Sequence, residues 1–384
     1  MSTYAQSARA QAPQQDTERP RGTVESDDQD LVGNAAVAER LGVNTPGSPG
    51  AGQDAEQGSG QQTAEGEGQE SETGPGAVTV RNGGIIVAVY DHNPQNHATS
   101  TCSRCQPRVA ALMAEGRTEN QARAQARQEH LADEPMPNDI AEFERMALDF
   151  VSDHNAMPAI PVTHKDQVAS GIRAALDQAR AETGDPELLV STVAFFAHGF
   201  RDSLKLGTRI GVMQVSSFVS GIQAMLTNDV VVANYACDTG QGPGDGAGSF
   251  SDTMHDALVD QGHTEATVMG HTSPAHVTNS PDLRLFEGSS TQGGGQHLST
   301  IIFPESYARQ QLEQDGVPTT AGNVTWLRQK MALFCMSAMQ GERARDFALL
   351  GEAERQAMIE QVRAEWPSSQ HYRDYEQRTR AWRR

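Results

Sequence analysis

The amino-acid sequence predicts an α/β fold in three layers, with helices on both faces of a mostly parallel sheet. Two observations predict the sheet: apolar runs of strand length recur along the chain, and helical segments alternate with them. A third observation concerns the two ends, because the first part lacks large apolar residues and the last part has a helical pattern. We therefore expect a disordered N-terminal arm, an α/β domain and a helical C-terminal extension.

The arm is expected over residues 1–77. Residues 1–80 contain 13 Asp and Glu against 4 Arg, with many Gln, Gly and Ser. Such a segment cannot bury enough apolar surface to offset its ordering entropy, which predicts disorder. Within it, residues 30–41 have a short helical pattern, and we expect them either to dock on a receptor or larger assembly or to form only a transient turn.

Composition excludes some classes of function. The net charge of −20 argues against nucleic acid as the main partner. The sequence has no apolar run of about 20 residues and no signal-peptide pattern at its start, so we expect no membrane span. Four cysteines in 384 residues do not make a disulfide framework. A cytoplasmic location is expected, and export by a route that needs no signal peptide stays open.

The first strand is expected over residues 84–90, an apolar run that follows two glycines. A helical insertion over residues 106–155 comes next, with a charged helix over 106–130 and an amphipathic helix over 139–151. A short strand over 160–163 then leads into a helix, over residues 165–183.

Two stronger apolar runs follow, and they predict buried strands over residues 188–197 and 230–235. The remaining elements are expected as helices over 215–226 and 250–261, strands over 266–270 and 299–303, and helices over 326–339 and 352–366. Residues 371–384 are expected to be a frayed end. The α/β domain thus spans residues 78–305 and the helical extension residues 306–384.

Chemically reactive residues follow the two strongest strands. One strand ends in His198-Gly199 and the other in Ala236-Cys237. If the strands are parallel neighbours, the imidazole and the thiol lie at the same edge of the sheet, where sites form in α/β folds. A nearby imidazole can take the proton of a thiol and so make a nucleophile. The backbone N–H groups of Gly199 and Cys237 could then form an oxyanion hole.

The order of strand, His198-Gly199, hairpin-like turn, helix, strand and Ala236-Cys237 resembles the caspase-like cysteine peptidases, a group that includes caspases, legumains and gingipains. Cys237-Asp238-Thr239-Gly240 is most similar to the legumain-type members. The resemblance covers about residues 84–270. It implies a caspase-like sheet and a cysteine endopeptidase that hydrolyses peptide bonds, with His198 and Cys237 as catalytic dyad and Gly199 as oxyanion donor. Separately from the resemblance, Asp238 is expected to bind substrate and help set specificity, and an acidic cleft would favour a basic residue before the cleaved bond.

Other interpretations stay open. His271 follows the strand over 266–270 and could serve as base in the papain order, but Cys237 precedes a glycine-rich segment and not a long helix. His271 is therefore expected to line the same cleft and bind substrate, or to cap the sheet edge. The plain alternative is a buried cysteine and a hydrogen-bonded core histidine. The chain would then be a binding, structural or cargo protein of a bacterial or phage assembly.

One further motif has the composition of a metal site. His92, His97, Cys102 and Cys105 form an H-x4-H-x4-C-x2-C pattern. Zinc prefers four nitrogen and sulfur ligands in a tetrahedron, which these residues can supply. The alternative is a solvent-facing loop with two thiols. The predicted dyad itself needs no cofactor.

Overall fold

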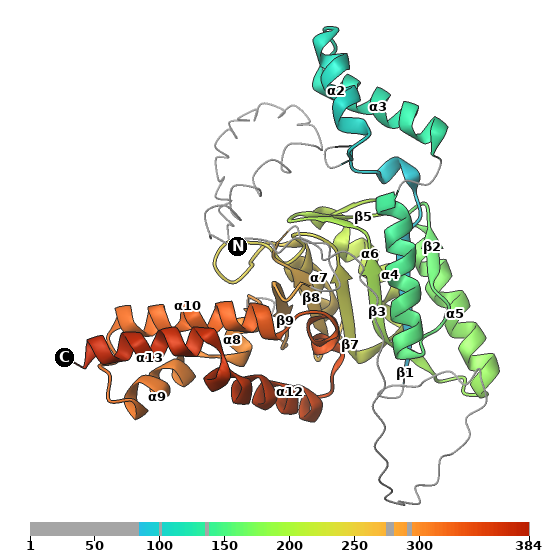
Figure 1. Cartoon of the computed structure of the whole chain (residues 1–384). Coiled ribbons are helices and arrows are strands. Elements are labelled where there is room, and N and C mark those ends of the chain that lie inside the picture. Colours follow the sequence, from blue (N-terminus) through green and yellow to red (C-terminus); the bar gives the residue numbers. More distant parts are fainter. Residues whose placement is uncertain (1–83, 100–101, 135–137, 274–279, 290–293, 384) are drawn as a thin grey trace, which may run out of the picture. The chain divides into compact units, whose positions relative to one another are not determined.

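The computed structural model describes residues 84–383, with gaps at 100–101, 135–137, 274–279 and 290–293 (Figure 1). The predicted arm, including the helical pattern over 30–41, lies outside the described residues.

The described part is built on a seven-stranded sheet with the order β10-β9-β8-β7-β3-β1-β2. Five strands run parallel to one another: β1 (Gly84–Asp91), β2 (Ile160–Val162), β3 (Leu189–Phe196), β7 (Leu226–Tyr235) and β8 (Thr267–His271). Two short strands at one edge are antiparallel, β9 (Leu283–Phe286) and β10 (Gln296–His297). The predicted α/β class with a mostly parallel sheet is confirmed.

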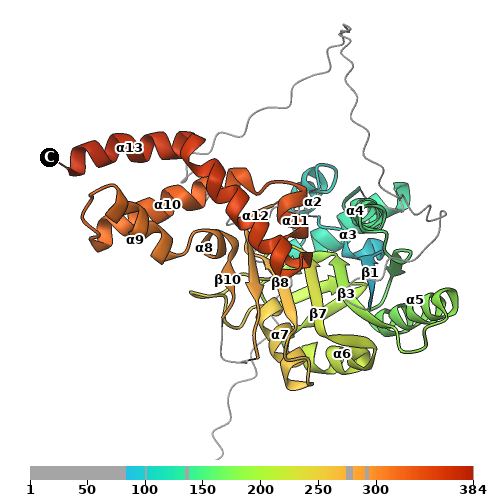
Figure 2. The same ribbon diagram turned by 90° about the horizontal axis from the view of Figure 1, so that it is seen from below.

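Each face of the sheet has its own core, because successive strand residues point to opposite faces. Val87 and Val89 belong to the core under α5 (Gln167–Thr183), α6 (Val215–Ile222) and α7 (Phe250–Asp260). Ala88 and Tyr90 belong to the core on the other face, under α4 (Asn138–His154) and the C-terminal helices. Figure 2 shows α5, α6 and α7 together on one side of the sheet and α4 and α12 on the other.

A small antiparallel sheet follows β3 directly, where the sequence predicts a hairpin-like turn. It consists of β4 (His198–Phe200), β5 (Ser203–Leu206) and β6 (Thr208–Gly211). The buried carboxylate of Asp91, at the end of β1, accepts a hydrogen bond from the N–H of Gly207 at 3.1 Å. This bond joins the turn between β5 and β6 to the same sheet edge at which β3 and β7 end.

The helical insertion has three helices, and the prediction of a single helix over 106–130 is wrong. The segment divides into α2 (Cys105–Ala114) and α3 (Glu119–Asp133). Gly116 adopts a φ of +91° between them, and the Thr118 side chain begins α3 as half of a capping box with Gln121. The periodicity of a charged helix does not reveal this break, because both helices are polar on most of their surface.

The C-terminal segment is more helical than predicted. The expected strand over 299–303 is instead α8 (Leu298–Ile302), which the His297 ring caps by accepting from the N–H of Ser299. The expected frayed end is also helical, and its Tyr375 is buried. The helices of this segment are α9 (Glu305–Gln314), α10 (Ala321–Ala338), α11 (Glu342–Asp346), α12 (Glu352–Glu365) and α13 (Gln370–Trp382). Short 3-10 helices complete the chain at Pro94–Asn96, Val212–Gln214, Gln223–Met225, Phe347–Leu349 and Trp366–Ser368.

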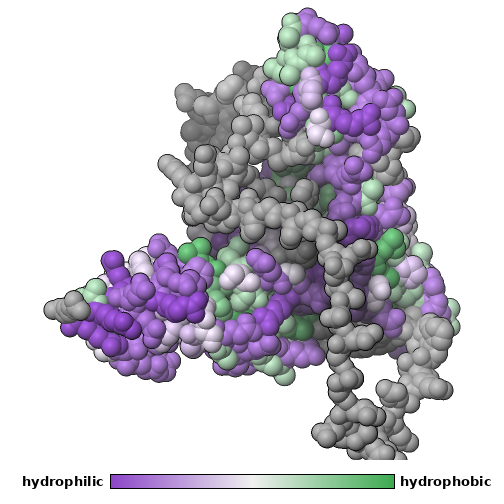
Figure 3. Space-filling view, in the orientation of Figure 1, coloured by the Kyte–Doolittle hydropathy of each residue, from purple (hydrophilic) through white to green (hydrophobic). Residues whose placement is uncertain are grey.

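The C-terminal helices share a core with the sheet. Trp366 and Tyr375 belong to the same cluster of buried side chains as Phe196 of β3 and Tyr235 of β7. The Tyr235 hydroxyl also donates a hydrogen bond to the carbonyl of Arg345 at 2.8 Å. The outer surface of these helices that is visible in Figure 3 is mostly hydrophilic. Their apolar side chains therefore point into this shared cluster.

Candidate functional site

The ends of β3 and β7 bring the predicted dyad residues to matching positions. The two strands are parallel neighbours, and Phe196 and Tyr235 form the last pair in register. His198 and Cys237 each stand two residues beyond that pair. Phe196 and Tyr235 both point to the face that α4 covers, and Cys237 packs against the core of that face. The sheet therefore directs both side chains toward the same side of the same edge.

Gly199 makes a close contact with the segment that carries Cys237. A Cβ on Gly199 would lie 2.2 Å from the Cys237 carbonyl oxygen and 2.8 Å from the Ala236 Cβ. No side chain fits in that space, so glycine is required at this position for steric reasons. The backbone that follows His198 thus touches the backbone of Cys237.

The turn after Cys237 is fixed from both sides. Asp238 has a φ of +56°, one of two positive values among the described residues other than glycine. The Gly240 N–H donates to the His271 carbonyl at 2.8 Å, and the Thr239 carbonyl accepts from the N–H of Ser251 at the same distance. Left-handed residues other than glycine cluster at functional sites, although Asp tolerates this conformation better than most residues.

The imidazole of His198 is oriented by two residues of α4. Its Nε2 lies 3.1 Å from the Oδ2 of Asp139, and its ring meets the ring of Phe143 edge to face at 4.9 Å. A carboxylate only accepts hydrogen bonds, so Nε2 carries a proton, and in the neutral form of the ring Nδ1 holds the lone pair. Nδ1 is therefore the ring atom that can take a proton from a thiol.

Asp139 is a functional residue that sequence reasoning missed. It lies in the first turn of α4 and also accepts hydrogen bonds from His97 Nδ1 at 2.6 Å and from the Ala98 N–H at 2.9 Å. Burial alone would raise its pKa, but the hydrogen bonds from His198 and His97 hold the pKa well below the usual range of a carboxyl group. Asp139 is thus ionised at neutral pH.

The thiol of Cys237 is partly buried. Burial, followed by the nearby charge of Asp238, raises the pKa of Cys237 to about 12. At neutral pH the resting side chain is therefore a neutral thiol, which needs a base to become a nucleophile.

His271 lies at the end of β8, on the same sheet edge, but its side chain is only 1% exposed. Burial lowers its pKa to about 4, and the charge of Asp282 offsets this in part. A neutral, buried histidine does not line a solvent-filled cleft, so its burial argues against the predicted contact with substrate. Asp238, the other predicted substrate-binding residue, is half-buried beside Cys237.

A second constellation lies in the insertion. One ligand atom from each of His97, Cys102, Cys105 and His130 lies within 4.8 Å of the others, and this group could hold a metal ion. The Cys105 sulfur lies 3.5 Å from His97 Nε2 and 3.2 Å from His130 Nδ1, and the Cys102 sulfur lies 3.4 Å from His130 Nδ1. Below, we call these four residues the His/Cys cluster.

The fourth residue of the cluster corrects the prediction. His92 is not part of it, because its ring packs edge to face against Tyr90 at 5.7 Å. His130, near the end of α3, takes its place. The fold of α3 back onto α2 brings His130 next to Cys105, and the motif around the two cysteines does not indicate a ligand that far along the chain.

Both histidines of the cluster donate to carboxylates through their other ring nitrogen. His97 Nδ1 contacts Asp139, and His130 Nε2 lies 3.0 Å from the Oε2 of Glu134. Such carboxylates are typical of metal-ligating histidines. Hydrogen bonds from Cys105 outweigh burial and lower the pKa of Cys102 to about 7. A substantial fraction of Cys102 is therefore thiolate at neutral pH, which is the form that binds metal.

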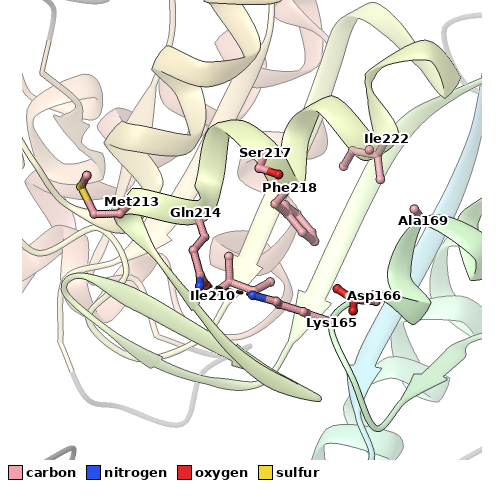
Figure 4. A pocket seen from close by; sticks show the side chains of 10 residues that line it. Lys165, Asp166, Ala169, Ile210, Met213, Gln214, Ser217, Phe218 and Ile222 are labelled. Atoms are coloured by element: carbon pink, nitrogen blue, oxygen red, sulfur yellow. Dashed lines mark hydrogen bonds between the residues drawn. The ribbon is translucent and has the colours of Figure 1, made fainter.

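A cavity of about 460 Å³ lies between the start of α5, the strand β6 and α6 (Figure 4). Lys165 crosses it and donates to the Gln214 side chain at 3.0 Å. Ile210 on β6 and the largely exposed Met213 are among its lining residues. None of the predicted catalytic residues lines this cavity, because His198 stands on β4, the opposite edge of the small sheet.

No known protein family, curated protein or solved structure matches the chain. Within the described ranges, no helix combines the length and apolar character needed to cross a bilayer. The function is therefore inferred from the residues of the chain itself.

Proposed function

We propose that the protein is a cysteine peptidase, with Cys237 as nucleophile, His198 as general base and acid, and Asp139 as the residue that positions His198. The register of β3 and β7 carries this proposal, because it gives His198 and Cys237 equivalent positions on one face of one sheet edge. The order of these elements is also the order on which the resemblance to caspase-like peptidases rests.

The proposed reaction begins when His198 Nδ1 accepts the thiol proton of Cys237. The resulting thiolate attacks the carbonyl carbon of a peptide bond, and the imidazolium gives its proton to the leaving amine. Water then hydrolyses the thioester with His198 acting as base. The Asp139 carboxylate accepts from Nε2–H throughout, holding the ring in one tautomer and stabilising its positive charge.

Two further roles belong to the same proposal. The N–H groups of Gly199 and Cys237 are the proposed oxyanion donors, and the close contact at Gly199 supports this pairing. Asp238, held in its left-handed turn next to the nucleophile, is the proposed contact for a basic substrate side chain. A cytoplasmic location and a partner for residues 1–77 stay predictions from the sequence.

We also assign zinc to the His/Cys cluster, as a structural ion. Zinc bonds of about 2.3 Å to sulfur and 2.0–2.1 Å to nitrogen, at tetrahedral angles, place sulfur and nitrogen ligands about 3.5 Å apart. The sulfur–nitrogen distances of 3.2–3.5 Å in the cluster fit this requirement. Four protein ligands leave no open position for substrate, which is typical of structural sites.

The proposal is tested with electrophilic peptide probes whose residue before the reactive group is Arg, Lys, Asp or Leu. Labelled protein is digested and the modified cysteine identified by mass spectrometry. Labelling is expected at Cys237 and not at Cys335, whose pKa burial likewise raises to about 12 but which has no part in the proposed site. His198→Ala should abolish labelling without changing the melting temperature by more than a few degrees.

Failure to label Cys237 with any probe, in protein that is folded and loaded with zinc, contradicts the peptidase assignment. The same sheet would then favour the non-catalytic alternative, a binding or structural protein. Fast labelling that persists in His198→Ala would show a reactive thiol that does not depend on the proposed base.

A further inference from the structure

The two proposed sites share one carboxylate. Asp139 Oδ1 lies 2.6 Å from Nδ1 of His97, a member of the His/Cys cluster, and Asp139 Oδ2 lies 3.1 Å from Nε2 of His198. The side chains of all three residues are at most 15% exposed, so little water competes for these bonds. The Asp139 side chain thus contacts His97, which would hold zinc, and His198, the proposed general base.

From this bridge we infer that zinc bound at the His/Cys cluster switches the peptidase site on by fixing Asp139, and that the metal-free protein is inactive. The inference rests on the proposed peptidase function. It extends that function, because it gives the structural ion a regulatory role.

The orientation of the His97 ring is the first link. His97 Nε2 points at the cluster, 3.5 Å from the Cys105 sulfur, and Nδ1 points at Asp139. With Nε2 bound to a metal, the ring proton must reside on Nδ1, the atom that donates to Asp139. Without a metal, nothing holds Nε2 at the cluster, and the hydrogen bond with Asp139 alone orients the ring.

The weak packing of the α2–α3 hairpin is the second link. Its own buried cluster consists of Cys105, Leu112, Ala122 and Ala126. Two alanines and a cysteine bury little apolar surface, and so this core contributes little to the free energy of folding. Zinc binding would therefore supply much of the stability of this hairpin. His97 precedes the hairpin in the chain and Asp139 follows it. Whether the hairpin is folded therefore determines whether these two side chains meet.

The consequence for the base follows from these links. When His97 is released, Asp139 retains the Ile140 N–H of its own helix as a donor to Oδ1, at 3.1 Å, and the N–H of Ala98, the chain neighbour of His97. It loses the shortest of these hydrogen bonds, so the Asp139 carboxylate is held less firmly. The acceptor of the His198 Nε2–H is then less fixed, and so is the tautomer that leaves Nδ1 ready for the Cys237 proton.

The test is a titration of the full-length protein with zinc, from a metal-free and reduced state, in a chelator buffer that keeps free zinc too low to bind weaker sites. Zinc per chain is counted by elemental analysis. The labelling rate of Cys237 is followed by peptide mass spectrometry, which separates it from Cys102 and Cys105. The ring nitrogen signals of His198 are followed by ¹⁵N NMR. We expect one zinc per chain, a Cys237 labelling rate at least tenfold higher at saturation, and a shift of the His198 signals over the same zinc range.

A matched pair of variants separates coupling from metal affinity. Glu134→Gln removes the carboxylate behind His130. Glu134 caps the C-terminal end of α3, and among the described residues it forms hydrogen bonds with His130 and Arg104 and none with His198. This change should weaken zinc binding about 10–100-fold. The Cys237 labelling curve should then shift to higher free zinc by the same factor and reach the same plateau. Asp139→Asn should bind zinc but fail to reach that plateau.

Each outcome has a defined meaning. A Cys237 labelling rate and His198 signals that do not change while zinc binds overturn the inference and leave the peptidase proposal intact. His198 signals that shift with zinc, in a protein whose Cys237 stays inert, support the coupling and contradict the peptidase. As a control on folding, the circular dichroism spectrum of the metal-free protein must retain most of the helical signal. A metal-free Glu134→Gln protein whose Cys237 labels at the full rate would also overturn the inference.

Discussion

At the scale of single residues, Gly199 allows the most direct test of the proposed site. In Gly199→Ala the new Cβ would meet the Cys237 carbonyl oxygen at 2.2 Å, so one of the two segments must move. We expect a loss of about 1–3 kcal/mol in the free energy of unfolding, which is typical of overpacking, and loss of Cys237 labelling. Urea denaturation and the peptide probes measure the two effects.

The control is Gly221→Ala in α6. Its Cβ would lie 3.9 Å from that of Ala169, an ordinary contact, and alanine favours the helix by up to about 1 kcal/mol. This variant should be as stable as the wild type or more so, and should label normally. Equal effects of the two substitutions would mean that the contact between Gly199 and Cys237 is absent.

His271 predicts a pH dependence of stability. Its pKa is about 4 in the folded protein, whereas an unperturbed histidine has a pKa of about 6.5. Between these values the unfolded chain binds a proton at this position and the folded chain does not. The wild type should therefore lose about 3 kcal/mol from this group as the pH falls from 6.5 to 4, and keep the full contribution above 6.5.

His271→Leu removes that titration. The difference in the free energy of unfolding between the wild type and this variant, measured in urea at half-unit pH steps, should change across pH 6.5–4 and be constant on either side. A constant difference throughout would show that His271 is not buried as a neutral side chain.

Sequence reasoning found His198 and Cys237 because each stands at the end of a long apolar run, a pattern that is visible in one dimension. It missed Asp139 and His130 for a physical reason. Both lie on helices, where acidic residues and histidines are common, and their roles depend on tertiary contacts. Asp139 lies 59 positions from His198 in sequence, and His130 lies 25 positions from Cys105. No local pattern reports such contacts.

At the scale of elements, the start of α3 predicts a link between a helix cap and zinc affinity. Thr118 accepts from the Gln121 N–H at 3.4 Å, and the Gln121 side chain accepts from the Thr118 N–H at 3.2 Å. Thr118→Ala should cost the helix about 1 kcal/mol. Because α3 carries His130, zinc affinity should fall about fivefold, which is the equivalent factor.

Thr320→Ala is the matched control, since Thr320 caps α10 in the same way, accepting from the N–H of Asn323 at 3.3 Å. It should cost a similar free energy while leaving zinc affinity unchanged. Competition with a chromophoric chelator measures the affinity, and hydrogen exchange over residues 119–133 measures the helix. An unchanged zinc affinity in Thr118→Ala would mean that α3 is held in place without its cap.

Long, strongly patterned elements were the most predictable. The strand over 84–90 agrees closely with β1, because burial on both faces leaves a continuous apolar run. The strand over 230–235 matches only the apolar part of β7, which begins four residues earlier, with a polar and partly exposed segment after Leu226. Residues 299–303 were predicted as a strand and form α8, since a short apolar run suits either structure and only the His297 cap decides between them. The short strand β9 gave too weak a pattern to be predicted.

At the scale of the whole molecule, the C-terminal helices are expected to be indispensable to the fold. Ile359, Val362 and Trp366 belong to the same buried cluster as the apolar side chains of one sheet face, so their removal exposes part of that cluster. A chain ending at residue 351 should be insoluble or lack a cooperative thermal transition. The control is a chain ending at residue 382, which lacks only the last two arginines and should melt like the wild type. A soluble, cooperatively folding chain of 351 residues would show that α12 and α13 are not needed for the fold.

The shared core also orders events during synthesis. The chain leaves the ribosome from its N-terminus, so β3 and β7 emerge well before α12 and α13 are made. Until then, Phe150 of α4 packs on Phe196 and Tyr235, but Tyr235 has no Arg345 carbonyl to bond. The strand that leads to Cys237 therefore gains part of its contacts only from the last part of the chain. If the proposed peptidase site is real, a nascent polypeptide would carry it without the hydrogen bond between Tyr235 and Arg345 until the end of the chain is made.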